Sequence, residues 1–514
     1  MKKLSRNLAR NAVFLFLDWL SISLLNFIFW SLSSKLLSPE EYGIISTSIN
    51  FSTLLSNVAL FGLNATLWKL IPEYLKRKKF GKVKSLVGFS VKSVLAMSIS
   101  LILLLFVVQE YVRCLLGMDM LTFTLTLLNI VIISFWSLFG SVLLGFQRVK
   151  KMMYTDLVGH VAKIIFTALF VILGYSYLGP VLGYAFGIFS IVLMRFPRGL
   201  VAWKDGVDKK KIITNFAIPA LISNFAWVVF INGQYVLITG LKTPEITGFY
   251  TIALLMTVPI VSIPNILSTS LFPIISSLTV AKNTLVEKRK LIEETIRLSL
   301  TFSIPVAIVL FFVSRNAVLI FSDERYLEAL TFLPYLILAA LIYGLGIVLS
   351  QSLYSLGKPK TQRNIVLGTM AMFLLTGVPL TYLFSGIGTS LAYLISVTFL
   401  AVYSYVRVKE MVKLKILIKD LAKIAFASLL TITMLYFFTI FGLMDKLLPS
   451  IILGVVSGVV FILLLSLLRF FNKIDMFFFE YVIGLIPVIR KKKIRSRMLL
   501  LLNEKYKNGK KKGK

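Results

Sequence analysis

The chain is poor in the residues on which most soluble proteins and many enzymes depend. It has one cysteine, one histidine and 22 acidic residues among 514, and charged residues make up only 15% of it. One cysteine excludes an intrachain disulfide, and one histidine beside it excludes a metal site built from soft ligands. So few charges are also too few for the surface of a soluble globule. We therefore expect a membrane protein with no metal site and no bound cofactor.

Motifs that carry enzymatic chemistry are also missing. No G-x-x-x-x-G-K-[ST] phosphate loop occurs, and Gly357-Lys358 precedes a proline in an expected turn, so ATP is not expected as a direct energy source. No Ser/His/Asp set or pair of carboxylates stands at an expected membrane face. These absences predict a protein that is not an enzyme.

What the sequence has is apolar residues, which make up 58% of it and gather in long stretches. A helix of about 20 residues crosses the roughly 30 Å hydrocarbon core of a bilayer. Stretches of this kind lie near residues 12–34, 43–65, 86–108, 120–144, 155–174, 178–196, 212–239, 246–271, 298–319, 330–355, 364–384, 386–406, 421–442 and 447–468. They predict an all-α integral membrane protein with about 14 transmembrane helices.

Positive charge is distributed unequally between the two sides of these spans. If the N-terminus is cytoplasmic, 48 of the 56 Lys and Arg residues fall on the cytoplasmic side, as the positive-inside rule requires. Both termini are therefore predicted to be cytoplasmic, and the net charge of +34 does not indicate a nucleic-acid partner. Residues 474–489 are interrupted by Asp475, Glu480 and Pro487, so we expect an interfacial helix there. The basic tail that follows is expected either to bind anionic lipids or to be solvated and disordered.

An eight-residue motif occurs twice, 205 residues apart. It reads L-L-S-P-E-E-Y-G at 36–43 and L-K-T-P-E-I-T-G at 241–248, and in each copy we expect a tight outer turn. Each repeat holds six spans, so both enter the membrane from the same side as parallel repeats. The predicted organisation is an N-lobe at 1–200 with spans 1–6, a C-lobe at 207–407 with spans 7–12, spans 13–14 at 408–470, and the interfacial helix and basic tail at 471–514.

Several turns carry a family resemblance. The P-E-x-x-G turns, G-F-Q-R at 145–148, L-G-K-P-K at 356–360 and G-I-G-T-S-L-A at 386–392 resemble those of polysaccharide-biosynthesis flippases. These are O-antigen flippase-like members of the multidrug/oligosaccharidyl-lipid/polysaccharide (MOP) exporter superfamily. The resemblance implies a V-shaped pair of lobes that uses alternating access to pass a lipid-linked glycan from the cytoplasmic to the outer leaflet. It also implies a prokaryotic plasma membrane and glycan-assembly enzymes as possible partners, with Na⁺ or H⁺ coupling open. Where members carry an Asp-Arg pair, this chain has Gln234 and Tyr235, so no role of that pair is carried over.

Charged residues inside the spans are candidate site residues, because a charge costs at least ~2.5–3.5 kcal/mol at the bilayer centre. Asp18, Lys92 and Lys163 are expected at similar depths, and Asp156, His160 and Lys163 share one helical face. One interpretation is a cationic site that binds the pyrophosphate of a polyprenyl-linked sugar. The other is an ion pair of Asp18 with a lysine that holds the lobe together. Asp18 and Asp156 can serve as coupling carboxylates or ion-pair partners, and His160 is more often a packing residue than a proton switch.

Uncharged polar residues recur at helical spacing along the second and eighth spans. The stripes are Ser46, Asn50, Thr53, Asn57 and Asn64, and Thr247, Thr251, Ser262, Asn265 and Thr269. Such groups suit a hydroxyl-rich sugar, but they also hold membrane helices together. The candidate substrate-binding amides are Asn50, Asn57, Asn224, Gln234 and Asn265. Pro259, Pro264 and Pro273 permit kinks in the eighth span.

The function predicted from these features is a flippase for a lipid-linked oligosaccharide. A cation-coupled multidrug exporter of the same superfamily, with Asp18 as the coupling carboxylate, is the first alternative. A membrane glycosyltransferase or glycan ligase is the second, although the longest outer loop, near 315–329, is short. Its acids Asp323, Glu324 and Glu328 resemble solvated surface.

Overall fold

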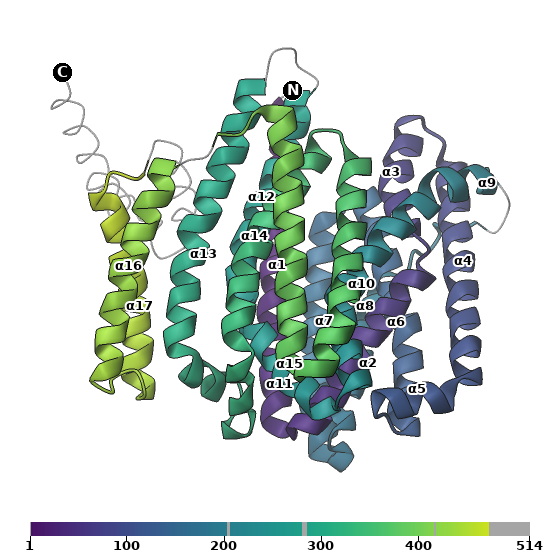
Figure 1. The fold of residues 1–514 in the computed structure, drawn as a ribbon. Helices are drawn as coiled ribbons and strands as arrows, with labels where there is room; N and C mark the ends of the chain where they lie inside the picture. The colour runs from purple at the N-terminus through teal and green to yellow at the C-terminus, as the bar shows by residue number, and fades with distance from the viewer. Residues whose placement is uncertain (1, 203–205, 280–284, 416–417, 472–514) are drawn as a thin grey trace.

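The structure is a computed structural model that describes residues 2–202, 206–279, 285–415 and 418–471, and within these ranges it contains helices and no strands. Long helices stand roughly side by side (Figure 1). The helices that we call the N-lobe are α1 (Lys2–Leu36), α2 (Pro39–Ala59), α3 (Leu63–Lys76), α4 (Phe80–Val107), α5 (Gln109–Leu116), α6 (Met120–Gly145), α7 (Val149–Phe170), η1 (Val171–Tyr175) and α8 (Leu178–Arg195).

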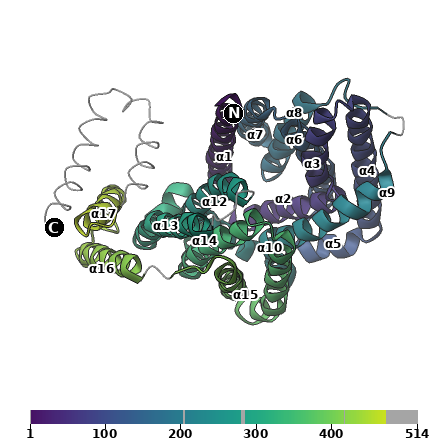
Figure 2. The ribbon, with the colours of Figure 1, turned by 90° about the horizontal axis from the view of Figure 1, so that it is seen from above.

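The C-lobe and the last two helices follow. The C-lobe comprises α9 (Lys209–Ile212), η2 (Ile213–Ala217), α10 (Ile218–Leu241), α11 (Pro244–Met256), α12 (Val258–Thr279), α13 (Leu285–Phe321), η3 (Glu324–Thr331), α14 (Leu333–Ser355) and α15 (Pro359–Val412). Two further helices, α16 (Ile418–Ile440) and α17 (Leu447–Leu467), pack against α13 at the edge of the molecule (Figures 1 and 2). The predicted interfacial helix and basic tail fall almost entirely on residues 472–514, which lie outside the described residues.

The all-α membrane architecture is confirmed. Ten of the described helices are long and apolar enough to span a membrane, or twelve if each of two bent pairs is one span. The 54-residue helix α15 also breaks at Ser385, where φ is 54° and ψ is −136°. This break lies between the two spans expected at 364–384 and 386–406. The total of fourteen spans stays a prediction.

The second and eighth spans are both bent, but at different distances from the repeated motif: the bend near Phe61 follows Gly43 by 18 residues, and the bend at Thr257 follows Gly248 by nine. The angle between α2 and α3 is 50°, and the angle between α11 and α12 is 49°. In the C-lobe the bend falls at Thr257, just before Pro259, where the sequence predicted a kink. In the N-lobe the bend contains no proline and instead has Phe61 and Gly62 at positive φ. The bend is therefore common to both repeats, and proline is only one of the ways in which it is made.

The two copies of the repeated motif meet each other. Each forms a tight turn and then starts a helix with proline in its first turn, α2 after Ser38 and α11 after Thr243. A Cβ atom on Gly43 would lie 1.7 Å from the carbonyl oxygen of Pro244, and one on Gly248 would lie 2.1 Å from that of Pro39. Both glycines are thus required by a backbone contact between the lobes, which we call the glycine joint.

Hydroxyl groups extend the glycine joint along α2 and α11. Thr239 of α10 bonds to Thr47 at 2.6 Å and to Thr247 at 2.7 Å, and Thr251 donates to Ser46 at 3.1 Å. All of these side chains are buried. Ser46 and Thr251, which the sequence placed in two polar stripes, therefore connect the lobes here, and Thr247 of the second stripe bonds to Thr239 within the C-lobe.

The lobes also touch near both predicted membrane faces. On the predicted outer side, the Tyr326 hydroxyl donates to the Leu37 carbonyl at 3.1 Å. On the predicted cytoplasmic side, the Asn224 amide donates to Asn64 Oδ1 at 3.3 Å, and a Cβ on Gly62 would lie 2.2 Å from a C-lobe backbone oxygen. The structure therefore represents a state in which the lobes are in contact at both ends.

Candidate functional site

The charged residues of the N-lobe meet between α1 and α7, which pack side by side. The two helices are expected to run in the same direction across the membrane. Asp18 of α1 lies against Asp156 of α7, and Asn26 of α1 bonds to Lys163 of α7. Asp18 and Asn26 are eight residues apart on α1, and their partners Asp156 and Lys163 are seven residues apart on α7, so the two spacings are nearly equal. Parallel packing places two polar contacts about 10 Å apart along the helices.

Asp156 has an ion-pair partner and a separate hydrogen-bond donor. Its carboxylate forms an ion pair with the guanidinium of Arg195 from the end of α8, and both side chains are only 1% exposed. The Trp136 indole N–H donates to Asp156 Oδ1 at 3.0 Å. Arg195 in turn donates to Thr155 Oγ1 at 2.8 Å and to the Met152 carbonyl at 2.9 Å. A buried ion pair with this many hydrogen bonds fixes α6, α7 and α8 relative to one another.

Asp18 is buried beside this ion pair, close enough to the Asp156 carboxyl for the two acidic groups to influence each other. Two ionised carboxylates can only accept hydrogen bonds, so neither can donate to the other. Asp18 Oδ1 has no hydrogen-bond partner within the described part of the chain. The predicted ion pair of Asp18 with a lysine does not form in this state. The arrangement can hold a proton between the carboxyls or admit a cation in its place.

Lys163 is fully buried and lies among neutral groups. Its Nζ donates to Asn26 Oδ1 at 2.5 Å and sits 4.2 Å from the centre of the Phe29 ring and 5.5 Å from that of Tyr184. Aromatic faces attract a cation but do not neutralise it. A Cβ atom on Gly187 of α8 would lie 2.6 Å from the Lys163 Cα, so the glycine allows α8 to close over the lysine.

His160 lies on the same face of α7, as its spacing predicted. Its ring meets Trp136 edge to face at a centroid distance of 6.4 Å. Neither ring nitrogen has a hydrogen-bond partner among the residues that the structure describes. These contacts favour the packing interpretation for this side chain.

Lys92 does not join the cluster. It is exposed on α4, and α4 stands on the opposite side of the N-lobe from α1 in both views (Figures 1 and 2). The similar depth expected for Asp18, Lys92 and Lys163 therefore does not bring all three together. Depth alone says nothing about the direction in which each helix presents its side chain.

The candidate amides lie in different surroundings. Asn50 and Asn57 are half-buried on α2 and donate to carbonyls one turn earlier in their own helix, at 2.8 and 2.9 Å. Asn265 is half-buried on α12, and Asn224 forms the contact with Asn64 described above. Their amide oxygens and remaining hydrogens can bind sugar hydroxyls.

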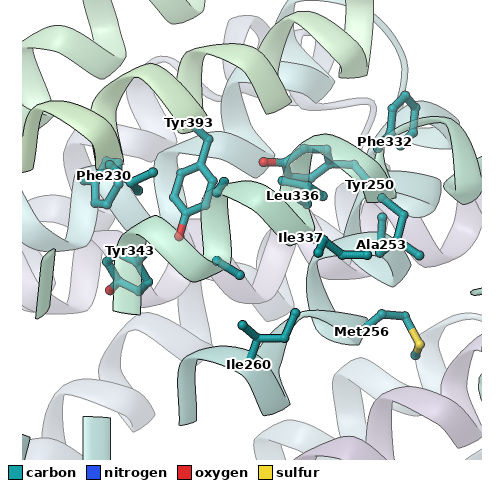
Figure 3. Close-up of a cluster of buried hydrophobic side chains, with 14 of the residues drawn as sticks. Phe230, Tyr250, Ala253, Met256, Ile260, Phe332, Leu336, Ile337, Tyr343 and Tyr393 are labelled. Atoms are coloured by element: carbon teal, nitrogen blue, oxygen red, sulfur yellow. The ribbon is translucent and has the colours of Figure 1, made fainter. Parts of the chain in front are cut away.

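Gln234 is buried inside the C-lobe. Its Oε1 accepts from the Tyr250 hydroxyl, and its Nε2 donates to the Phe230 carbonyl at 3.1 Å. Around it the C-lobe core is aromatic (Figure 3): the rings of Phe230 and Tyr393 stack with centroids 5.3 Å apart, and Tyr343 lies beside them. Gln234 is therefore a core residue in this state.

Three partners in the cluster were not predicted. Arg195 lies at the end of a predicted span, so the sequence places it among the cytoplasmic cations. Its long side chain extends from there to Asp156. Trp136 gave no signal, since aromatic residues are frequent in spans. Asn26 is a polar residue in the middle of an apolar span, and that signal was present in the sequence.

Of the three acids of the outer loop, Asp323 has a structural role, whereas Glu324 and Glu328 are exposed, as the sequence predicted. Asp323 accepts hydrogen bonds from the Arg325 backbone N–H at 2.9 Å and from its guanidinium. Arg325 also donates to the Lys35 carbonyl of the N-lobe at 3.2 Å. Burial alone would raise the pKa of Asp323, but the hydrogen bonds from Arg325 outweigh it and hold that pKa below its ordinary value.

The helical fold of this chain is also found in solved structures of transporters. A structure titled "Lipid II flippase MurJ, inward closed conformation" matches with a TM-score of 0.70 and 17% identity, over 89% of this chain and 98% of that one. An inward-facing multidrug resistance MATE family transporter of the MOP superfamily matches with a TM-score of 0.60 and 13% identity, over 76% and 95%. A MOP superfamily transporter from Pyrococcus furiosus gives 0.54 and 13%, over 79% and 95%. Identities this low show the fold alone.

The family follows from the sequence itself. The family model described as "Polysaccharide biosynthesis protein" matches residues 8–279, just over half of the chain. The chain belongs to this family, which confirms the resemblance in its turns. A search of curated proteins found no significant match.

Proposed function

We propose that the protein is a flippase that carries a polyprenyl-pyrophosphate oligosaccharide from the cytoplasmic to the outer leaflet by alternating access. Three findings support this proposal: the polysaccharide-biosynthesis family, the MOP fold, and a structural neighbour whose title names it a lipid II flippase. In this proposal the protein sits in a prokaryotic plasma membrane with both termini cytoplasmic. The lipid-linked glycan is its substrate, and glycan-assembly enzymes act before and after it.

The observation that carries the proposal is the environment of the Lys163 ammonium group. Its side chain is buried in the membrane part of the N-lobe, and its recorded partners among the described residues are an amide oxygen and two aromatic rings. A cation kept in a membrane without a carboxylate partner favours an anionic ligand. Pyrophosphate supplies such a ligand, whereas a cationic drug is repelled.

The ligand reaches Lys163 only after the helices move. Phe29 and Tyr184 cover the ammonium group in this state, so the contact with pyrophosphate forms when α1 and α7 shift during transport. The half-buried amides of Asn50, Asn57 and Asn265 then offer hydrogen bonds to the sugar hydroxyls. Opening toward the cytoplasm breaks the contact of Asn224 with Asn64, while the glycine joint keeps the outer side closed.

The test is translocation of a fluorescent polyprenyl-pyrophosphate oligosaccharide in reconstituted vesicles. We expect Lys163→Gln to lower the initial rate at least about tenfold, the equivalent of roughly 1.4 kcal/mol, and Lys163→Arg to retain part of it. Lys92→Gln is the matched control, because it removes an exposed lysine of the same lobe. Wild-type rates in Lys163→Gln would overturn the assigned role of this residue. No transport of any polyprenyl-linked glycan by wild type would overturn the proposed substrate.

A second candidate function rests on the contact between Asp18 and Asp156. A carboxyl pair that can exchange a proton for a cation suits a cation-coupled multidrug exporter of the same superfamily. Efflux of a cationic dye, driven by a Na⁺ or proton gradient and abolished in Asp18→Asn, would support that function. If Asp18→Asn still translocates the glycan but the rate no longer responds to the gradient, the carboxyl pair couples the gradient to transport in the flippase.

A glycosyltransferase or ligase has less support. In the outer loop, where such an enzyme would act, Asp323 caps η3 and pairs with Arg325, and Glu324 and Glu328 are exposed. We therefore propose that the protein transports the glycan and does not transfer or cleave it. Release of free glycan or pyrophosphate from the labelled substrate during the vesicle assay would contradict it.

A further inference from the structure

A basic cavity lies at one end of the N-lobe and shares Arg195 with the charge cluster. It has a volume of about 320 Å³ and lies where α6 ends, α7 begins and α8 ends. These three helix ends are on the predicted cytoplasmic side. The charged residues that line the cavity are Arg148, Lys151, Arg195 and Arg198, and none of the lining residues is acidic.

Three of these cations are available to a ligand. The guanidinium of Arg195 is engaged with Asp156, but Arg148, Lys151 and Arg198 are exposed. Within the described ranges none of the three forms an ion pair. Like charges gathered at one cavity repel one another, and an anion bound among them relieves that repulsion.

Two turns hold the cations at the cavity. Gln147 has a φ of 56° and ends α6, and the Arg148 N–H then bonds back to the Leu143 carbonyl at 2.9 Å. After α8, the Arg198 N–H bonds to the Phe196 carbonyl at 2.8 Å. Because backbone hydrogen bonds fix both turns, Arg148 and Arg198 stay at the cavity without a carboxylate to hold them.

The start of α7 adds partial positive charge. Arg148 is the residue before this 22-residue helix, and its side chain makes no capping bond. The N–H groups of the first turn therefore have no side-chain acceptor at their cap, and helix starts of this kind attract phosphate oxygens. Two arginines, a lysine and a helix N-terminus together favour a phosphate group.

Apolar side chains surround the same cavity. Leu193 and Phe196 line it and are 56% and 52% exposed, while Val142 and Leu143 are buried in its wall. Exposed apolar groups next to long cationic side chains are typical of the boundary between lipid tails and headgroups. A ligand that fits both the cations and these apolar groups is an amphiphile, with a phosphate head and acyl chains.

We propose that this cavity binds the phosphate headgroup of an anionic phospholipid of the cytoplasmic leaflet. The phosphate contacts Arg148, Lys151 and Arg198, and the acyl chains run along Leu193 and Phe196. Arg195 lines the same cavity and holds Asp156, so the bound lipid stabilises the junction of α6, α7 and α8 on which the charge cluster depends. The proposal concerns lipid binding and holds whether or not the protein transports a glycan.

The test measures binding directly on the full-length protein. The protein is purified in a neutral detergent and titrated with phosphatidylglycerol or with phosphatidylcholine, and bound lipid is counted by native mass spectrometry. We expect saturable retention of phosphatidylglycerol and at least a fivefold loss of it in the triple variant Arg148→Gln/Lys151→Gln/Arg198→Gln. The matched control is Lys78→Gln/Lys79→Gln/Lys82→Gln, which removes three exposed cations from the turn between α3 and α4 and from the first turn of α4. Equal loss in both triple variants would mean unspecific charge attraction and would overturn the proposal, as would full retention in both.

A second pair of measurements separates a lipid from a soluble phosphate. Leu193→Ser/Phe196→Ser keeps all the cations and removes the apolar contacts, so it is expected to retain less phosphatidylglycerol than wild type. Inorganic pyrophosphate at millimolar concentration is expected not to displace the lipid. Displacement by pyrophosphate, with unchanged lipid retention in the serine variant, would assign the cavity to a soluble phosphate and overturn the lipid proposal. Circular dichroism and size-exclusion profiles confirm that each variant is folded.

Discussion

The two lobes share a fold and differ in what they bury. The N-lobe buries Asp18, Asp156, Lys163 and Arg195 beside one another, whereas the C-lobe core that contains Gln234 is made of stacked aromatic rings (Figure 3). Burying charges in a membrane costs free energy, and stacked rings pack favourably there. The comparison teaches that two repeats of one fold can have interiors of different chemistry.

The largest effect is expected from breaking the ion pair of the N-lobe. Asp156→Ala leaves the Arg195 guanidinium buried without its partner, a change that typically costs about 3–5 kcal/mol. We expect thermal unfolding in detergent to shift sharply downward. The double variant Asp156→Leu/Arg195→Met is the control, because it removes both charges and should recover most of the stability. A single variant as stable as wild type would contradict the assigned ion pair.

The next prediction concerns the glycine joint, to which both lobes contribute the same motif. Gly43→Ala or Gly248→Ala puts a methyl group against a backbone oxygen of the other repeat and should separate the two lobes there. In a Cys114→Ser background, we expect labelling of Ser46→Cys by a membrane-impermeant maleimide to rise about tenfold, which corresponds to ~1.4 kcal/mol.

Gly233→Ala is the control for the glycine joint. A Cβ at this position would meet its nearest neighbour at 3.6 Å, an ordinary contact. Labelling should therefore stay at the wild-type level. Similar labelling in all three alanine variants would contradict the claim that the glycine joint keeps the outer side closed.

Inside the aromatic lobe an effect on stability, and none on transport, is expected. Tyr250→Phe removes the hydroxyl that donates to Gln234 and leaves a buried acceptor unsatisfied, which costs about 1–3 kcal/mol. Translocation per folded molecule should not change. Tyr42→Phe is the matched control, since the hydroxyl of that buried tyrosine has no hydrogen-bond partner in the described chain. Lost transport with retained stability in Tyr250→Phe would mean that the C-lobe core also serves the substrate.

The smallest effect concerns the outer contact between the lobes. The pKa of Asp323 is lower in the folded protein than in the unfolded chain, so its contribution is present above about pH 4 and is lost as the pH falls through the lower, folded pKa. The pair is partly exposed, so we expect less than about 1 kcal/mol. The protection factor of the Arg325 N–H, which is its intrinsic hydrogen-exchange rate at each pH divided by the observed rate, should fall in acid and in Asp323→Asn at neutral pH. Glu328→Gln should leave it unchanged.

Much of this architecture could be predicted because it follows from one-dimensional patterns. Apolar stretches predict membrane helices, and the break at Ser385 falls where the sequence separates two spans. The repeat predicts two related halves, and the spacing of Asp156, His160 and Lys163 places them on one face of α7. Each of these inferences needs only the period of a helix and the thickness of a bilayer.

The rest depends on how helices lie against one another. Asp18 meets Asp156 and not a lysine because α1 and α7 pack in a particular register, which no local pattern encodes. Arg195 joins from α8 through a long side chain, and Lys92 faces away on α4. The polar stripe of the second span is divided in the same way, with Ser46 in the lobe contact and Asn50 and Asn57 half-buried beyond it.

The glycine joint also bears on how two halves of one chain can diverge. What meets there is main chain from each copy, the carbonyls of Pro39 and Pro244 against positions that carry no side chain. A contact made by the backbone constrains no neighbouring side chain; it requires only that these two residues stay glycine. Substitutions elsewhere in either repeat can therefore change the interior from charged to aromatic without disturbing the contact between the repeats.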